Sequence, residues 1–189
     1  MARAGLTRAA VVEAGARQAD EAGLSHVTLA ALAAGFGVRL PSLYRHVGGL
    51  DDLRRGVTVL ALHELDATLT AAVVGLAGRD ALGALARAYR EYARRRPGCY
   101  EATLRAPDPD DAEHVAAAPA LAATVFAALR GYGLDGDDEI DAVRIARAGL
   151  HGFVSLEAAG GFGLPRDVDR TFDRLIETLH TGLTSAAST

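Results

Sequence analysis

Polar side chains in the segment over residues 40–46 have the chemistry needed to bind a nucleic acid. The segment reads LPSLYRH, and its polar members are Ser42, Tyr44, Arg45 and His46. Hydroxyl, imidazole and guanidinium groups donate hydrogen bonds to backbone phosphates, which fix the register of a protein on a duplex. Arginine also pairs bidentately with guanine, and serine exchanges hydrogen bonds with several bases. This segment is therefore the candidate DNA-reading surface.

The residues around this segment predict two short helices joined by a glycine-bearing turn. Thr28 is a candidate N-cap for the first helix, over residues 28–34. Gly37 suits the left-handed residue of the turn, and Pro41 is tolerated because it falls in the first turn of the second helix. The side chains predicted to face inward are Leu29, Leu32, Ala33, Leu43 and Val47. Two short helices at this spacing are typical of a helix-turn-helix.

Apolar residues elsewhere recur at the helical period, so the chain is predicted to be all-α. The predicted helices span residues 7–22, 50–74, 80–96, 99–104, 111–130, 137–159 and 167–185. The helix over residues 137–159 is predicted to bury Ile140. We expect a three-helix helix-turn-helix domain over residues 1–50, and a larger helical domain over residues 51–189.

Charge is distributed unevenly along the chain. Residues 1–50 contain five arginines and three acidic residues, a net charge of +2, whereas the remaining residues contain 15 arginines and 21 acidic residues, a net charge of −6. This asymmetry fits an anion-binding head on an acidic body.

Other classes of site lack the residues they need. Cys99 is the only cysteine, which excludes an intrachain disulfide and favours a reducing compartment. The six histidines are scattered without metal-ligand spacing, so neither a metal nor a cofactor is expected. No serine lies in a Gly-x-Ser-x-Gly context, and we expect no enzyme. The first residues lack a signal-peptide core, and no run of about 18 apolar residues predicts a membrane span, so a cytoplasmic protein is expected.

Residues 7–55 resemble the DNA-binding domain of the tetracycline-repressor (TetR) family. The matching residues are Thr7, Ala22-Gly23, Thr28-Leu29, Leu32-Ala33, Gly37-Val38 and Ser42-Leu43-Tyr44-Arg45-His46. The resemblance implies that the second short helix lies in the major groove. Together with the polar pattern, it gives these candidate DNA-contacting residues: Thr28, Arg39, Leu40, Pro41, Ser42, Tyr44, Arg45 and His46. Leu50 stands where family members often have lysine.

The C-terminal half resembles the TetR subfamily named for a Trp-His-Gly (WHG) triplet, here Leu150-His151-Gly152. The resemblance implies a homodimeric repressor that binds a palindromic operator, with recognition helices about 34–36 Å apart, and is released by a small molecule. It also implies that residues 51–189 form the helical ligand-binding and dimerisation domain. Candidate pocket residues are Tyr89, Tyr92, Cys99, Tyr100, Phe126, Leu150, His151 and Phe153. The amphipathic last helices predict a dimer interface formed by Phe153, Phe172, Leu175, Ile176, Leu179 and Leu183.

Two other interpretations of the sequence remain open. One is a helical enzyme or ligand carrier, which would need a paired acid and base that the sequence does not display. The other is a dimeric ligand-binding or interaction protein with a degenerate DNA-binding head, an alternative that the leucine at position 50 and the net acidity of the chain leave open.

Overall fold

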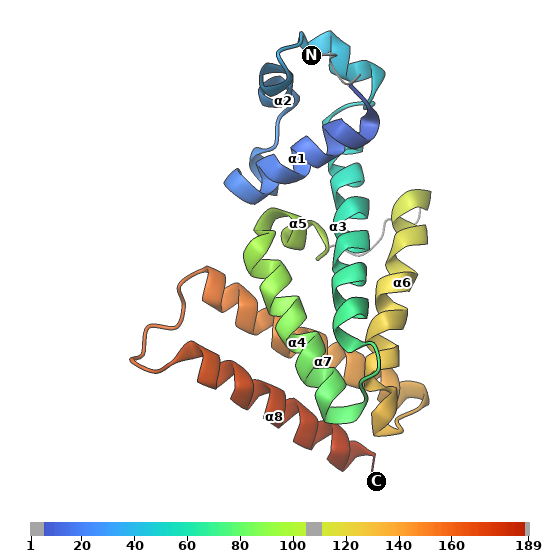
Figure 1. Ribbon diagram of the computed structural model, residues 1–189, viewed down its shortest axis with the longest axis vertical. Helices are drawn as coiled ribbons and strands as arrows, with labels where there is room; N and C mark the ends of the chain where they lie inside the picture. The colour runs from blue at the N-terminus through green and yellow to red at the C-terminus, as the bar shows by residue number, and fades with distance from the viewer. Residues whose placement is uncertain (1–5, 105–110, 188–189) are drawn as a thin grey trace. The chain divides into compact units, whose positions relative to one another are not determined.

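The computed structural model describes residues 6–104 and 111–187, and the regular elements in these ranges are all helical (Figure 1). The α-helices are α1 (Arg8–Ala22), α2 (Leu29–Phe36), α3 (Leu50–Val73), α4 (Gly78–Arg95), α5 (Pro97–Ala102), α6 (Ala112–Leu129), α7 (Gly136–Ala158) and α8 (Val168–Ala186). Short 3₁₀ helices are η1 (Leu24–His26), η2 (Leu40–Arg45) and η3 (Arg130–Tyr132). The predicted all-α fold is confirmed.

The first two helices begin at the predicted N-caps and α1 ends where predicted, but α2 continues two residues beyond the predicted end at residue 34, to Phe36. The Thr7 and Thr28 hydroxyls accept hydrogen bonds from the N–H groups of Ala10 and Ala31, at 3.1 and 3.3 Å. These are N-caps, in which a side chain satisfies a backbone donor that the helix leaves free. Gly37 follows α2 in the left-handed conformation, with φ of 64°, which glycine adopts at no steric cost.

The chain forms two compact units, each built from two stretches of sequence. Unit 1 comprises Met1–Leu65 and Arg95–Pro119, and unit 2 comprises Asp66–Arg94 and Ala120–Thr189. The boundaries between the units fall inside α3, at the last residue of α4 and inside α6, where Pro119 lies in the helix. The two units differ from the two predicted functional domains, residues 1–50 and residues 51–189. That division into functional domains stays a prediction.

In unit 1, α1 packs closely against α3 because glycines lie at the contact. A Cβ atom on Gly56 of α3 would lie 2.7 Å from a methyl carbon of Val12, and one on Gly15 of α1 would lie 3.0 Å from a methyl carbon of Leu53. The core of the unit around this contact includes Val11, Ala16, Val27, Leu43, Leu53 and Val57. Leu43 connects the core to the candidate reading segment.

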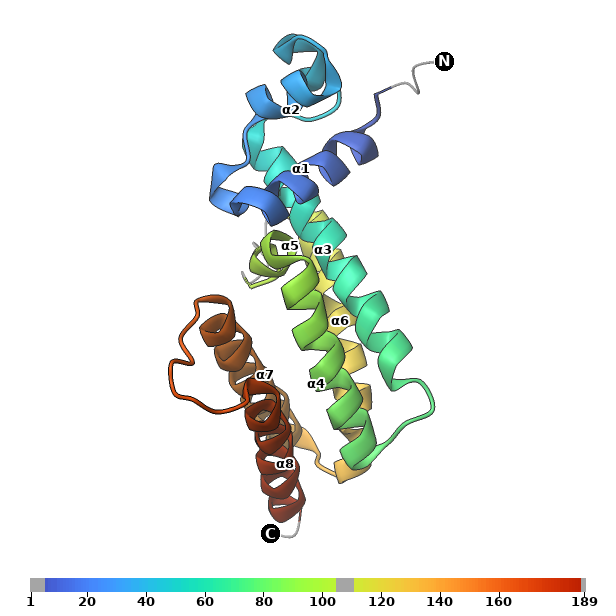
Figure 2. The ribbon, with the colours of Figure 1, turned by 60° about the vertical axis from the view of Figure 1, so that its left-hand side comes forward.

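In unit 2, α7 and α8 lie side by side (Figure 2). They approach closely at Gly149, where an added Cβ would lie 3.6 Å from Leu175 and 3.7 Å from Leu179. One face of α4 is buried, formed by Leu82, Leu85, Ala86, Tyr89 and Tyr92. The prediction that Ile140 is buried is wrong, because Ala142 and Ala146 occupy the inner face of α7 and leave Ile140 39% exposed.

Two helical segments are long and apolar enough to cross a membrane by length and composition alone, namely Leu50–Val73 and Ala112–Tyr132. Core helices of soluble proteins meet the same criterion. In each segment a set of apolar side chains is buried within the units, including Leu65 and Leu69 of α3 and Ala128 and Leu129 of α6.

Candidate DNA-binding interface

The candidate reading segment forms η2, whose polar side chains face outward. Leu43 and Val47 are fully buried beneath it, whereas Tyr44 is 55% exposed and Arg45 is exposed. Ser42 and His46 are half-buried. The predicted second short helix is therefore present, in the tighter 3₁₀ form, with bonds such as His46 N–H to the Leu43 carbonyl at 2.8 Å.

The residues that begin this segment are also on the surface. Arg39 is the N-cap of η2, and Arg39, Leu40 and Pro41 are all exposed. Within residues 6–104 and 111–187, no acidic side chain forms an ion pair with Arg39 or Arg45. Two guanidinium charges on one short segment therefore remain available to an anionic partner.

Thr28 begins α2 and combines two features that suit a phosphate contact. Its oxygen accepts the Ala31 N–H, which leaves its hydroxyl proton able to donate to an anion. It also lies at the N-terminus of α2, where free N–H groups and the helix dipole favour negative charge. Gln18 holds the residue in place by accepting its backbone N–H at 3.2 Å.

The connector between α1 and α2 is held at two points within unit 1. Arg54 of α3 donates to the Ser25 carbonyl at 3.1 Å, and Glu101 of α5 accepts the Leu24 N–H at 3.3 Å. These bonds fix η1, which leads into Thr28 and α2. The position of the reading helices therefore depends on both α3 and α5.

Asp52, in the first turn of α3, binds both the start of α1 and the end of the reading segment. Its carboxylate accepts hydrogen bonds from Arg8 at 2.8 and 3.1 Å and from the Gly48 N–H at 2.8 Å. The hydrogen bond from Arg8, then that from Gly48, lowers the pKa of Asp52 against the opposing effect of partial burial. The contact of this acid with Arg8, 44 residues away, lay beyond reasoning from local patterns.

A second charged cluster joins α5 to α1. The Asp20 carboxylate accepts the N–H groups of Gly98 and Cys99, both at 3.0 Å, and pairs with Arg96 at 3.0 Å. Arg96 also lies 3.3 Å from Glu64. Local sequence patterns give no sign of the roles of Asp20 and Glu64, because the partners of both residues lie far away in the chain.

The predicted ligand-pocket residues are divided between the two units. Cys99 and Tyr100 belong to unit 1, and Tyr89, Tyr92, Phe126, Leu150, His151 and Phe153 belong to unit 2. Phe126 and His151 are half-buried and the other six are buried. Unit 1 has a surface groove between α1 and α2, and unit 2 has one between α7 and α8 and another between α4 and α8. None of the eight predicted pocket residues lines any of these three grooves. The ligand pocket stays a prediction.

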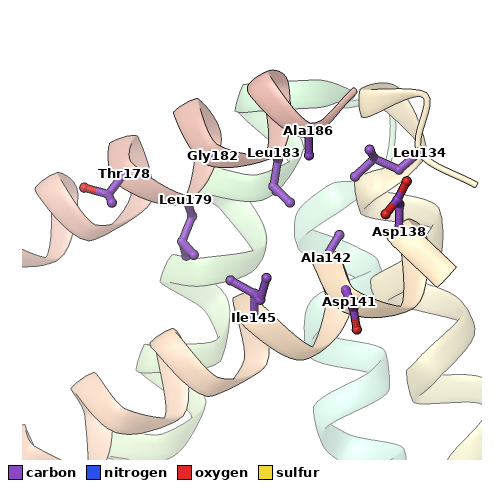
Figure 3. A pocket seen from close by; sticks show the side chains of 10 residues that line it. All are labelled: Leu134, Asp138, Asp141, Ala142, Ile145, Thr178, Leu179, Gly182, Leu183 and Ala186. Atoms are coloured by element: carbon purple, nitrogen blue, oxygen red, sulfur yellow. The ribbon is translucent and has the colours of Figure 1, made fainter. Parts of the chain in front are cut away.

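The predicted dimer-interface residues pack inside their own chain. Phe153, Phe172, Ile176, Leu179 and Leu183 are buried in unit 2, and Leu175 is half-buried. Figure 3 shows a groove of about 400 Å³ between α7 and α8, with Leu179 and Leu183 directed into it beside Ile145. Most of the apolar stripe of α8 therefore packs within unit 2, and its part in a dimer interface stays a prediction.

Metal-ligating side chains do not gather in the described part of the chain. Over residues 6–104 and 111–187, no group of three or more histidine, cysteine, aspartate or glutamate side chains is placed to hold a metal ion. Cys99 is buried, and burial raises the pKa of its thiol to about 12, which keeps it protonated and unreactive at neutral pH.

Comparison with known proteins identifies the family. Residues 82–179 match the family described as "Tetracyclin repressor-like, C-terminal domain". The chain is 39% identical over 179 residues to the uncharacterised HTH-type transcriptional regulator Rv0681 of Mycobacterium tuberculosis, covering 94% of this chain and 82% of that protein. It is 35% identical over 181 residues to the uncharacterised HTH-type transcriptional regulator YobS of Bacillus subtilis, covering 96% and 94%.

Solved structures show the same fold. The crystal structure of TetR from Acinetobacter baumannii AYE superposes with a TM-score of 0.69 at 20% identity, covering 98% of this chain and 100% of that one. A variant of that TetR in complex with minocycline gives a TM-score of 0.62 at 20% identity, covering 97% and 96%. With a helix-turn-helix head, a matching C-terminal domain and closely related regulators, the chain belongs to the TetR family of DNA-binding transcriptional regulators and is not an enzyme.

Proposed function

We propose that this regulator is a repressor that binds a palindromic operator as a homodimer through η2 and the start of α2. The observation that carries the proposal is the outward face of η2, where Tyr44, Arg39 and Arg45 lie exposed over the buried Leu43. Such side chains can meet phosphates and base edges as soon as the segment enters the major groove. In this proposal Thr28, Tyr44 and His46 contact phosphate, and Arg39, Leu40, Pro41 and Ser42 lie near base edges. Arg45 adds positive charge to the same surface.

The experiment that tests this proposal is selection from a pool of random duplexes by the purified full-length protein. Because two identical heads read two identical half-sites, the enriched sequences should contain an inverted repeat with half-sites about one helical turn apart. Enrichment of a single, non-repeated half-site would contradict dimeric reading. If no sequence is enriched over the starting pool, the head does not read DNA sequence.

The homodimer is proposed to form through the outward faces of α7 and α8. On α7, Ile145 is 58% exposed and Leu156 is 52% exposed, and Gly152 lies between them with open space around it. On α8, Thr178 and Gly182 are exposed beside the groove of Figure 3. Small residues flanked by exposed aliphatic side chains allow helices from a second copy to approach closely and bury apolar surface.

A small-molecule effector is proposed to release the operator. A variant of the similar TetR is solved in complex with minocycline, and the aromatic side chains proposed to line the pocket here include Tyr89, Tyr92 and Phe153. All three are buried, so an organic ligand would contact them only after the helices around them move apart. The ligand would act through its different affinities for the DNA-binding and released conformations. A screen that measures release of the selected duplex tests this step, and a ligand that binds the protein but leaves DNA affinity unchanged would contradict it. The cytoplasm is the proposed location, where the DNA lies.

A further inference from the structure

One carboxylate in unit 1 holds together the three segments that define the geometry of the DNA-binding head. The Oδ2 atom of Asp52 lies 2.8 Å from Nη1 of Arg8 and 2.8 Å from the backbone nitrogen of Gly48. Its Oδ1 atom lies 3.1 Å from Nη2 of Arg8. Asp52 belongs to α3, Arg8 begins α1, and Gly48 lies just after η2. Paired hydrogen bonds between arginine and a carboxylate fix direction as well as distance.

The segment held by Asp52 has few other constraints of its own. η2 is a single 3₁₀ stretch of six residues whose N-cap, Arg39, makes no side-chain capping bond. Such helices have poorer hydrogen-bond geometry than α-helices. The chain then passes through Gly48 and Gly49, and Gly49 has φ of 144°. Because glycine populates many conformations, this exit would be loose without a fixed point.

A capping role alone does not account for these contacts. Any acid in the first turn of α3 would interact favourably with the helix dipole, and Asp51 occupies that turn as an exposed side chain. Asp52 differs because it is directed back to Gly48 and across to Arg8, and its side chain is only 22% exposed. These contacts connect the exit of the reading segment to the helix against which the head packs.

We propose that Asp52, held by Arg8, is a positioning residue for DNA recognition, which fixes the exit of η2 so that Tyr44, Arg45 and His46 meet the duplex in one orientation. The inference rests on the proposed function of η2 as the reader. Leu43 and Val47 anchor the segment from below, and the Asp52 carboxylate fixes its end. Asp52 itself need not touch DNA.

The chain offers a matched control in Glu113, the other carboxylate beside Arg8. Glu113 lies 3.6 Å from Arg8, and its side chain is 67% exposed. Glu113→Gln and Asp52→Asn each remove one negative charge and one partner of Arg8. Removing an acid from a DNA-binding head ordinarily strengthens binding, because it reduces repulsion of the phosphates. If a change at Asp52 weakens DNA binding, the loss of negative charge therefore cannot be the cause.

The first test measures affinity for the duplex that the wild-type protein selects from random DNA, and for a scrambled duplex of the same length. We expect Asp52→Ala to weaken binding to the selected duplex about tenfold, and Asp52→Asn about threefold because the amide retains one acceptor. Affinity for the scrambled duplex should stay unchanged or rise slightly. Glu113→Gln should stay within twofold of wild type on both duplexes. Equal selected-duplex affinities for Asp52→Ala and Glu113→Gln would overturn the proposal.

The second test does not use DNA, so it separates failure of this inference from failure of the proposed function. Backbone ¹H–¹⁵N spectra of the full chain report on residues 43–48 directly. In Asp52→Asn, which keeps the shape of the side chain, the amides of residues 44–48 should shift and their ¹⁵N order parameters should fall, while those of α1 and α2 stay as in wild type. Unchanged order parameters over residues 44–48 would overturn the proposal whatever the DNA measurements give.

Discussion

Gly98 of α5 lies against Ala19 of α1 with no room for a side chain between them. A Cβ atom added at Gly98 would lie 2.2 Å from the Ala19 carbonyl oxygen and 2.6 Å from the Asp20 backbone nitrogen. The N–H of Gly98 meanwhile donates to the Asp20 carboxylate at 3.0 Å. The close approach and the hydrogen bond together join the start of α5 to the end of α1.

Gly98→Ala is therefore expected to destabilise the protein strongly. The clash involves backbone atoms, which cannot move aside as a flexible side chain can, so the cost should reach at least about 3 kcal/mol. Gly35→Ala is the matched control, because Gly35 lies in α2 with open space around it. That variant should be neutral or more stable by up to about 1 kcal/mol. Urea unfolding of both variants provides the comparison, and similar stabilities would refute the contact.

Tyr44→Phe and Arg45→Ala should each weaken operator binding without altering stability. Both side chains are exposed, so neither change creates a cavity in the core. Each change should cost about 1–3 kcal/mol of binding. Arg45→Ala should also lower the salt dependence by about one unit of slope because it removes a positive charge, whereas Tyr44→Phe should leave the slope unchanged. Arg144→Ala is the control, since it removes an exposed arginine from α7 in unit 2. If that control loses as much affinity as Arg45→Ala, the assignment of η2 as the reader is wrong.

Arg90 should be the most important charged residue for the stability of unit 2. It is 7% exposed, donates to Glu157 at 2.8 Å and to Asp169 at 2.7 Å, and lies 4.6 Å from the ring centre of Phe172. Arg90→Gln leaves the Glu157 charge poorly compensated, which should cost about 3–5 kcal/mol. Arg87→Gln breaks the exposed pair with Asp173 and should cost less than about 1 kcal/mol. Denaturant titration of the two variants tests this ranking.

The hydrogen bond between Arg90 and Glu157 also predicts how the stability of the protein depends on pH. The hydrogen bond from Arg90 lowers the pKa of Glu157, so the carboxylate binds its proton less readily in the folded state than in the unfolded one. The stabilisation is complete above the unfolded-state pKa of about 4.3 and is lost as the pH falls through the lower folded-state value. Arg90→Gln should therefore reduce the slope of unfolding free energy against pH below about pH 4.3. An unchanged slope would show that Glu157 is not coupled to Arg90.

The proposed dimer interface predicts opposite outcomes for two isoleucines. Ile145→Glu places a charge on the outward face of α7 and should yield a folded monomer by sedimentation velocity. Ile176→Glu buries a charge in the core of unit 2, where the side chain is 3% exposed, and should unfold the protein. A folded dimer in Ile145→Glu would exclude the outward face of α7 as the interface.

The sequence predicted local structure well because its signals were local. Thr7 and Thr28 cap helices through hydroxyls that reach three residues ahead, and Gly37 adopts the left-handed conformation that only a glycine takes easily. The alternation of Leu43 and Val47 with polar residues correctly gave the outward face of η2. These features depend on neighbours within one helical turn.

Features that depend on distant segments could not be predicted. The stripe of α8 from Phe172 to Leu183 was correctly identified as apolar, but periodicity cannot show whether such a stripe faces its own chain or a second copy. The hydrogen bonds from Arg8 and Gly48 to the Asp52 carboxylate were not predicted, because Arg8 and Asp52 lie 44 residues apart. Asp20 and Glu64 were missed for the same reason.

The central claim, that η2 reads DNA, is tested most directly by fluorescence anisotropy of the wild-type protein on its selected duplex and on a scrambled duplex across a salt series. We expect saturable binding to the selected duplex with two protomers bound. We also expect a steep fall in affinity with salt and a preference of at least about 10³ over the scrambled sequence. Equal affinity for the two duplexes at every salt concentration would contradict it, because the outward side chains of η2 would then carry no sequence information.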